Sequence, residues 1–340
     1  MQARASRSCN SLAGDSARAG RSRLHSFGPN GYCVKILKDR EVAERLDIPK
    51  LAAALEQAFQ SERHSFTMPP RMFLTQDAHT LLIMPCYGHG LLGLKVVTMA
   101  TEPGRGAHIV KTNYTLYDAE SGDVTLLAEA DSLTDLRTGA TSVVATRLLA
   151  RPDAKVLGIF GTGRQARVHI TAMFHAREFE RVLICGSSPE RTRAFVDSFS
   201  ATLHCPIQAA DANTCAAKAD VICTCTTSTS PLFDGRVLRP GTHLNLVGAF
   251  RSDTREVDDE TARRSRIVVD TYEGCLQEAG DILIPQSNGT IGAEHILADL
   301  HEALAGSRQV RRGPQDITLF KSVGCALEDL VAARLLQTSL

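Results

Sequence analysis

Three cationic side chains occupy positions from which they could hold a small carboxylate. Lys95 lies within the apolar run Leu91–Ala100, where an unpaired charge would be costly. Arg71 follows two prolines, which stiffen its approach, and Arg137 lies early in a stretch of helical character. Arginine binds a carboxylate through two parallel hydrogen bonds, whereas lysine acts as a point charge. Arg71, Lys95 and Arg137 are therefore our candidate catalytic residues, with a surface position or an internal ion pair as the alternative for each.

A glycine-rich turn predicts a second kind of site. Val156–Phe160 has the length and apolar character of a buried parallel strand, and a helix-compatible stretch follows the turn. The spacing G-x-G-x-x-A between them is typical of dinucleotide binding: Gly161 permits the tight turn, Gly163 lets the backbone approach a pyrophosphate, and Ala166 lets the helix pack on the strand. The residues of this turn predicted to bind the cofactor are Gly161, Thr162, Gly163, Arg164, Gln165 and Ala166.

The end of the next strand indicates which dinucleotide binds. In NAD enzymes an acidic residue about 20 residues beyond the glycine turn accepts both ribose hydroxyls. Here the strand ends in Ser187 and Ser188, with no acid, and Arg191 follows within a turn. Hydroxyls and an arginine suit a 2′-phosphate, so the sequence favours NADP(H) over NAD(H), although Glu190 lies close by. Thr226, at the end of a later strand, is also expected to border the cofactor.

Composition and charge narrow the class of protein. The chain has 340 residues, of which 43% are hydrophobic and 22% charged, and its formal net charge is zero. This length predicts two domains, and the neutral charge gives no reason to expect nucleic acid or a membrane as partner. No apolar stretch reaches the roughly 18 residues of a transmembrane helix. Ten cysteines without a secretory signal predict reduced thiols in a cytoplasmic protein. The histidines and cysteines lack the spacing of metal ligands, so no metal is expected.

Residues 1–31 form an extension of different composition. They contain five arginines and many small residues but a single acid, Asp15, and show no apolar periodicity. Such a stretch cannot build a core, so we predict that it is disordered. Organelle targeting is the alternative, because transit peptides share this composition.

From Tyr32 onward the pattern changes from mainly sheet to alternating strand and helix. Helices are expected over 39–46, 47–63, 131–150 and 293–305, the second capped by Asp47 and the third by Asp131 or Ser132. Strands are expected over 71–75, 81–86, 91–100, 111–117 and 124–128. Beyond residue 155 the alternation predicts a Rossmann-type doubly wound parallel sheet. The fold class is therefore α/β, with an additional α+β domain.

Several motifs resemble the ornithine cyclodeaminase/mu-crystallin family, from about residue 34 to residue 336. In the first half these are Pro69-Pro-Arg71, Gly93-Leu-Lys-Val-Val-Thr98, Asp135-Leu-Arg-Thr-Gly-Ala140 and the glycine turn. In the second half they are Phe233-Asp-Gly235, the stretch 238–249, Glu278-Ala-Gly-Asp281 and Thr318-Leu-Phe-Lys-Ser-Val-Gly324.

The resemblance implies a domain plan and roles for the candidate residues. Residues 32–145 and 306–340 would form a substrate-binding and dimerisation domain, completed by a returning C-terminal helix, and residues 146–305 the Rossmann domain. The protein would be a homodimer. Arg71, Lys95 and Arg137 are similar to the family residues that hold the substrate carboxylate, and Val247 and Ser322 would lie near the nicotinamide.

One departure from the family pattern indicates the branch. Ornithine cyclodeaminases carry an aspartate, directed at the distal amine of the substrate, where this chain has Phe250. The surrounding pattern instead resembles the ketimine reductases. We therefore predict NAD(P)H-dependent reduction of a cyclic imino acid, Δ1-pyrroline-2-carboxylate or Δ1-piperideine-2-carboxylate, to L-proline or L-pipecolate. Arg71 and Arg137 would clamp the carboxylate, and Lys95 would polarise it or help to deliver the imine proton.

Other functions stay open at this point. A deaminating enzyme, either an ornithine cyclodeaminase or an alanine dehydrogenase, is the first alternative. The presence of Phe250 argues against it. A non-catalytic mu-crystallin-like binding protein is the second, and the set of three cations speaks against it. An opine-type reductase that condenses an amino acid with a keto acid is the third.

Overall fold

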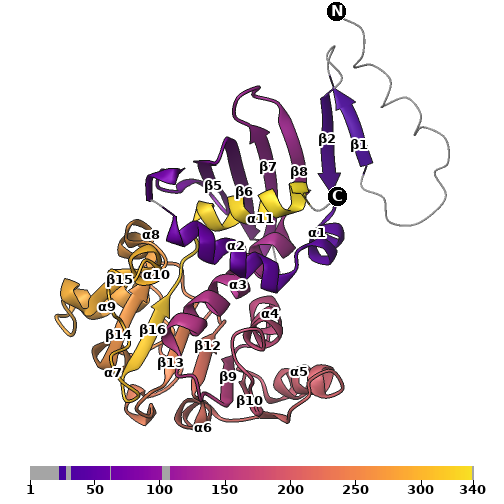
Figure 1. The fold of residues 1–340 in the computed structure, drawn as a ribbon. Coiled ribbons are helices and arrows are strands. Elements are labelled where there is room, and N and C mark those ends of the chain that lie inside the picture. Colours follow the sequence, from indigo (N-terminus) through magenta and orange to yellow (C-terminus); the bar gives the residue numbers. More distant parts are fainter. Residues whose placement is uncertain (1–22, 28–31, 62, 102–107, 339–340) are drawn as a thin grey trace, which may run out of the picture.

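The chain forms two domains, each built on an eight-stranded sheet (Figure 1). The computed structural model describes residues 23–27, 32–61, 63–101 and 108–338. The first sheet consists of β1 (Arg23–Phe27), β2 (Tyr32–Leu37), β3 (Phe66–Thr67), β4 (Met72–Gln76), β5 (His79–Gly88), β6 (Leu91–Thr101), β7 (His108–Asp118) and β8 (Val124–Glu129). Its order is β1-β2-β8-β7-β6-β5-β3, with β4 also paired to β5, and only β2 and β8 run parallel.

Helices from both ends of the chain cover the first sheet. They are α1 (Asp39–Arg45), α2 (Ile48–Gln60), α3 (Asp131–Leu149) and the C-terminal α11 (Ala326–Thr338), with a short 3-10 turn η1 (Arg63–Ser65) after α2. Asp47 caps α2 as predicted, since its side chain accepts from the Lys50 amide. Helix α11 packs on β5, β6 and α2 (Figure 1). Helix α3 packs on α2 in the first domain and on α4 in the second, which is why it is buried on most of its surface.

The second sheet has the doubly wound order of dinucleotide-binding domains. Its strands are β9 (Val156–Phe160), β10 (Arg181–Cys185), β11 (Ile207–Ala209), β12 (Val221–Thr224), β13 (His243–Leu246), β14 (Ser265–Val269), β15 (Ile296–Asp299) and β16 (Ile317–Lys321). They are all parallel, in the order β11-β10-β9-β12-β13-β16-β14-β15. The strand order therefore reverses between β9 and β12, where such sheets bind their ligands.

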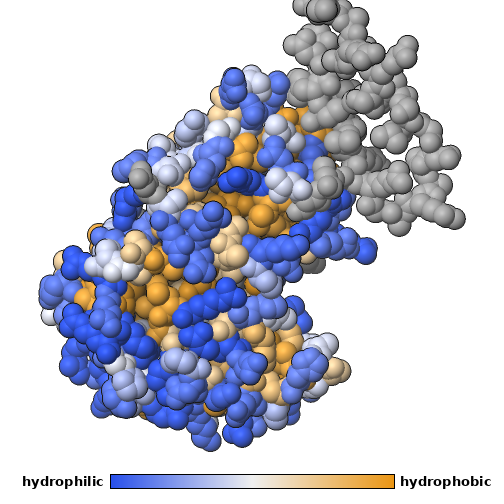
Figure 2. Space-filling model, viewed as in Figure 1, coloured by the Kyte–Doolittle hydropathy of each residue, from blue (hydrophilic) through white to orange (hydrophobic). Residues whose placement is uncertain are grey.

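Short helices connect these strands. They are α4 (Arg164–Met173), α5 (Pro189–Ser200), α6 (Ala212–Lys218), α7 (Asp259–Arg264), α8 (Tyr272–Glu278), α9 (Gly280–Ser287), α10 (Leu300–Leu304) and the 3-10 turns η2 (Gly235–Val237) and η3 (Ala293–His295). None of the helices in the described chain combines the length and apolar character that a membrane span requires. Hydrophilic side chains predominate on the face of the molecule that Figure 2 shows, and an indentation at the right of this view separates the upper and lower halves of the molecule.

Four local expectations were wrong. Ala130, not Asp131 or Ser132, is the N-cap of α3, because Asp131 accepts from the Thr112 amide instead. Residues 293–305 form η3, β15 and α10 rather than one helix. Within the predicted disordered extension 1–31, β1 pairs with β2; residues 1–22 and 28–31 lie outside the described chain. Strand β16 was expected in the first domain but lies in the second sheet, between β13 and β14. Among the described elements that follow residue 306, only α11 therefore returns to the first domain.

Asp220 ties the start of β9 to the end of α6 from a nearly buried position. Its Oδ2 accepts from the Lys155 and Val156 amides at 2.9 Å, and its Oδ1 accepts from Arg151 and Arg239 at 2.8 and 3.0 Å. We expect Asp220→Ala to lower the free energy of unfolding by about 3 kcal/mol, because it leaves buried donors without acceptors.

Denaturant unfolding measures this loss, and Asp153→Ala is the matched control. Asp153 is also paired with Arg151 but its side chain is 72% exposed, so its loss should cost less than about 1 kcal/mol. Equal effects of the two variants would contradict the role of Asp220.

Candidate active site and dinucleotide pocket

Arg71 is held against an acid at the wall of a pocket between the two domains. It precedes β4, and its Nε lies 2.7 Å from Oε1 of Glu278, at the end of α8. Its Nη2 donates to the backbone carbonyls of Val323 and Gly324, both at 3.0 Å. The pocket has a volume of about 210 Å³. Its wall includes Met68, Arg71, Met84, Thr271, Glu278, Gly324 and Cys325.

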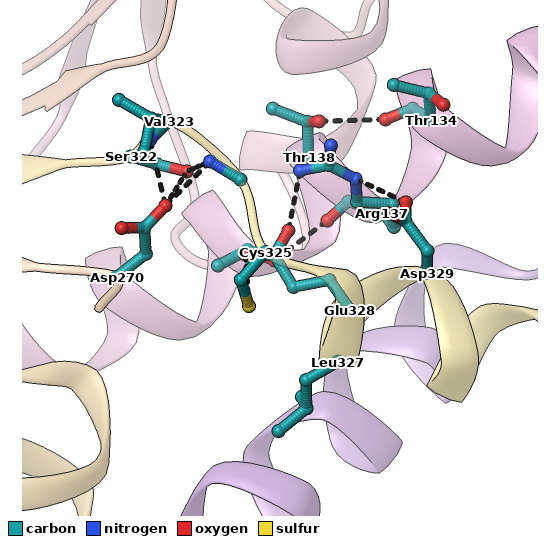
Figure 3. A network of polar contacts seen from close by, with 12 residues as sticks. Thr134, Arg137, Thr138, Asp270, Ser322, Val323, Cys325, Leu327, Glu328 and Asp329 are labelled. Carbon is teal, nitrogen blue, oxygen red and sulfur yellow. Dashed lines mark hydrogen bonds and ion pairs between the residues drawn. The ribbon is translucent and has the colours of Figure 1, made fainter. Parts of the chain in front are cut away.

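Lys95 and Arg137 lie behind this pocket, paired with two consecutive carboxylates of α11. The Lys95 Nζ is 2.6 Å from Asp329 Oδ2. Arg137 donates from Nε to Asp329 at 3.1 Å and from Nη1 to Glu328 at 2.7 Å, so its guanidinium lies between the two acids (Figure 3). Both carboxylates are fully buried. The structure thus joins all three predicted cations to acids, but of the three only Arg71 lines the pocket, so Arg137 does not lie beside Arg71 at the pocket wall as the predicted clamp of these two arginines requires.

Burial and pairing shift the pKa values of these groups in different directions. Burial lowers the pKa of Lys95 to about 8, against the opposing effect of Asp329. Burial also disfavours the charged form of Arg137, but Asp329 and Glu328 outweigh it and raise the pKa of the guanidinium. Burial raises the pKa of Glu278, and Arg71 offsets part of that rise. The surroundings of Glu278 therefore favour the protonated form of this pocket carboxyl.

A short loop between β16 and α11 separates the pocket from Arg137. Asp270, directly after β14, holds this loop: its Oδ2 accepts from the Ser322 hydroxyl and from the Val323 and Gly324 amides at 2.6–2.9 Å (Figure 3). Gly324 has a φ of +78°, and a Cβ there would lie 2.5 Å from the Arg137 guanidinium. Only glycine therefore fits between the pocket and Arg137.

The second pocket, of about 590 Å³, lies at the carboxyl ends of β9, β10 and β12. Of the residues predicted to bind the cofactor, Gly161, Thr162, Gly163, Ser187, Arg191 and Thr226 line it. Gly161 has a φ of +113°, and a Cβ there would lie 2.5 Å from the Cys225 carbonyl, whereas no atom lies within 4 Å of a Cβ at Gly163. The turn is thus tight at Gly161 and open at Gly163, which suits a dinucleotide pyrophosphate at the start of α4.

The other predicted cofactor residues do not line this pocket. Arg164 and Gln165 instead donate to Asp135 of α3, which ties the glycine turn to the first domain. Ala166 is a buried residue of α4, and Ser188 caps α5. The Val247 amide donates to Thr224, and Ser322 is bonded to Asp270. Phe250, which distinguished the branch in the sequence, is 46% exposed and lines neither pocket.

Sequence reasoning missed the acids that organise both pockets. Glu256 is fully buried: its Oε1 accepts from the amide and hydroxyl of Thr226, and its Oε2 accepts from Thr224 and from the Gly248 amide, at 2.7–2.8 Å. It thereby fixes the loop after β12 beside the loop after β13. Glu278 belongs to one of the motifs quoted above, but no pattern in the sequence indicated which residue it would pair with. Within the described residues, no cluster of three metal-ligating side chains occurs.

Fold and pockets together define a class: a two-domain dinucleotide-binding protein whose other pocket, between the domains, is lined by a cation paired with an acid. The family model for the ornithine cyclodeaminase/mu-crystallin family matches residues 34–340. The chain belongs to this family.

Named relatives and solved structures agree with this assignment. The chain is 34% identical to a Δ1-pyrroline-2-carboxylate reductase of Bacillus cereus, over 88% of this chain and 93% of the relative. It is 32% identical to the mouse ketimine reductase mu-crystallin, over 89% and 95% of the two chains. The structure of Thermococcus litoralis Δ1-pyrroline-2-carboxylate reductase with NADH and L-proline superposes with a TM-score of 0.85 at 35% identity, covering 89% and 96%. An archaeal alanine dehydrogenase dimer with bound NAD also reaches 0.85, at 28% identity, covering 90% and 95%.

The two glycines of the turn should respond differently to a methyl group. Gly161→Ala should lower the free energy of unfolding by about 2 kcal/mol, because its φ and the Cys225 carbonyl both oppose a side chain. Gly163→Ala should leave stability within about 0.5 kcal/mol but weaken cofactor binding about tenfold or more, because the open space it fills is where the pyrophosphate approaches. Thermal unfolding and dihydronicotinamide fluorescence titration measure the two effects; unchanged affinity in Gly163→Ala would refute the placement.

Proposed function

We propose that the protein reduces small cyclic imino acids with a nicotinamide cofactor, converting Δ1-pyrroline-2-carboxylate or Δ1-piperideine-2-carboxylate to L-proline or L-pipecolate. The observation that carries the proposal is the Arg71–Glu278 pair at the pocket wall. It offers a guanidinium for a carboxylate and a protonatable acid for a nitrogen, the two polar groups of a cyclic imino acid. The relatives with reductase names support the same reaction. Free thiols throughout the described chain fit a reducing compartment such as the cytoplasm.

The first step in this mechanism is an exchange of ion pairs. Glu278 contacts Arg71 through Oε1, while its Oε2 is buried and has no hydrogen-bond partner among the described residues. The substrate carboxylate takes the place of Glu278 on Arg71, where a bidentate contact orients the ring. Arg137 and Lys95 lie behind the Gly324 loop with their charges balanced by Asp329 and Glu328. Arg71 therefore carries the unbalanced positive charge once Glu278 is displaced.

Glu278 then acts as the proton donor for the nitrogen of the substrate. Once Arg71 no longer faces it, the remaining effects on Glu278 are burial and the negative charge of Asp270, and both favour the protonated acid. The protonated carboxyl donates to the imine nitrogen, and the resulting iminium is the better hydride acceptor. The cofactor, when bound, supplies the hydride to the C=N carbon. Glu278, now ionised, accepts a hydrogen bond from the N–H of the secondary amine so formed, and this amine takes up a further proton from water to become the ammonium of the amino-acid product.

A preference for NADP(H) over NAD(H) is also part of the proposal. Ser187 and Arg191 line the dinucleotide pocket, and the Arg191 guanidinium donates to the Ser187 hydroxyl at 3.3 Å. No carboxylate lines this pocket among the described residues. An arginine beside hydroxyls at this strand end suits a 2′-phosphate rather than a free 2′-hydroxyl.

We further propose that the protein is a homodimer that pairs through the first sheet. Apolar side chains on this sheet are exposed by 36–53% of their surface: Met72, Phe73, Leu74, Tyr87, Leu92, Ile109, Val110 and Leu127. Large exposed apolar side chains gathered on one sheet in this way are typical of subunit interfaces. A related alanine dehydrogenase is a dimer.

Turnover assays test the reaction directly. The purified protein with NADPH should oxidise the cofactor when given either cyclic imine and should form L-proline or L-pipecolate. Ammonia release from ornithine or alanine with oxidised cofactor, in the absence of imine reduction, would show a deaminating enzyme instead.

Glu278→Gln should lower kcat by about 100-fold, the range typical of a lost general acid, without raising KM. KM should not rise because Arg71 is then free of its competing carboxylate. Steady-state kinetics on the cyclic imine measure both constants. Glu294→Gln, which changes an exposed carboxylate outside the pocket, is the control. Unchanged kcat in Glu278→Gln would exclude the proton-donor role.

Arg191→Ala should reduce kcat/KM for NADPH by roughly 10- to 100-fold, the loss expected of one charge-assisted hydrogen bond. The value for NADH should change little, since NADH lacks the 2′-phosphate. Parallel titrations with both cofactors give the ratio. A parallel fall for both cofactors would contradict the assignment of Arg191 to the 2′-phosphate.

A further inference from the structure

Within the described part of the chain, Asp329 is the one carboxylate that contacts two of the three cations. Its Oδ2 lies 2.6 Å from Lys95 Nζ, and its Oδ1 accepts from Arg137 Nε at 3.1 Å. It is fully buried, and Lys95 is 2% exposed. Glu328, the preceding residue, pairs only with Arg137. Two neighbouring acids of α11 therefore differ in one respect: only Asp329 reaches Lys95.

Lys95 depends on this contact, because the remaining ionisable groups near it offer no compensation. Arg137 on α3 and Arg71 before β4 both disfavour its positive charge, and burial disfavours it more strongly. Tyr114 on β7 lies opposite Lys95 in the strand register, and Cys86 on β5 is buried nearby; burial raises the pKa of both groups, so they stay neutral. Among the described residues, Asp329 is the only anion paired with the ammonium.

We propose that Asp329 is a positioning residue for the reduction: it fixes the Lys95 ammonium and the Arg137 guanidinium behind the substrate carboxylate and keeps Lys95 protonated. This inference rests on the proposed function and adds to it a residue that does not touch the substrate. Cys325 and Ala326, where α11 begins, line the pocket. A single helical turn therefore connects the pocket wall with Asp329, which contacts both Lys95 and Arg137.

The pH profile of the variant separates this role from a structural one. The pKa of Lys95 is about 8, so kcat/KM of the wild type should fall above about pH 8. In Asp329→Asn the ammonium loses its only anion, so the fall should begin at least about one pH unit lower, with kcat/KM at pH 7 reduced about 100-fold. Glu328→Gln should leave the position of this fall unchanged, since Glu328 does not contact Lys95. The same imine is used for all proteins, so its own titration cancels.

A double-mutant cycle supplies the second readout. Because Asp329 also holds Arg137, adding Asp329→Asn to Lys95→Met should still lower kcat/KM, but by much less than the roughly 100-fold expected when Lys95 is present. Asp329→Glu, which restores the carboxylate, should recover the pH profile at least in part. Multiplicative effects in the cycle, or an unchanged pH profile in Asp329→Asn, would overturn the proposal.

If the wild type reduces no cyclic imine, the proposed function is refuted, but the pairing of Lys95 with Asp329 can still be tested. The test is the pH dependence of the free energy of unfolding, which needs no ligand. The Lys95 pKa is lower in the folded chain than the 10.5 of a free lysine, so between these values the unfolded state binds more protons. The contribution of Lys95 to the free energy of unfolding therefore rises with pH from about 8 to 10.5. In Asp329→Asn this rise should begin at lower pH. Parallel curves for wild type and variant would overturn the pairing.

Discussion

The active-site region depends on the pairing of buried cations with buried carboxylates. Burying the charges of Lys95 and Arg137 is costly, and the carboxylates of Asp329 and Glu328 offset that cost. The acids come from the last helix, which the chain reaches only after completing the second sheet. Charge neutralisation therefore requires that both ends of the sequence assemble, and it couples the folding of the first domain to α11.

Buried carboxylates also fix the loops that form the walls of the two pockets. Asp270 and Glu256 are acids of the second domain that accept mainly backbone amides and hydroxyls, and so fix the loops that follow β16, β12 and β13. Arg71, from the first domain, donates to the carbonyls of the loop that Asp270 holds. One loop is thus fixed from both domains, and it lies between the substrate pocket and Arg137. A carboxylate bound at Arg71 is in this way set at a defined position relative to the dinucleotide sheet.

Local sequence signals predicted the second domain well because its elements are locally determined. The apolar run before Gly161 and the spacing of the turn depend on neighbouring residues, as does the cap at Asp47 in the first domain. The site was predicted only in part. The cations could be recognised because Lys95 interrupts an apolar strand, but their acids, Glu278 and Asp329, lie roughly 200 residues away in the sequence, and no local pattern links them. The position of β16 was missed for the same reason, since parallel pairing with β13 is a long-range choice.

The central claim is that a substrate carboxylate replaces Glu278 on Arg71. The most direct test is a crystal structure of the protein with oxidised cofactor and L-proline. The account predicts the proline carboxylate on the Arg71 guanidinium and the Glu278 carboxylate on the proline nitrogen. A structure in which proline is bound while the Arg71–Glu278 pair stays intact would contradict it.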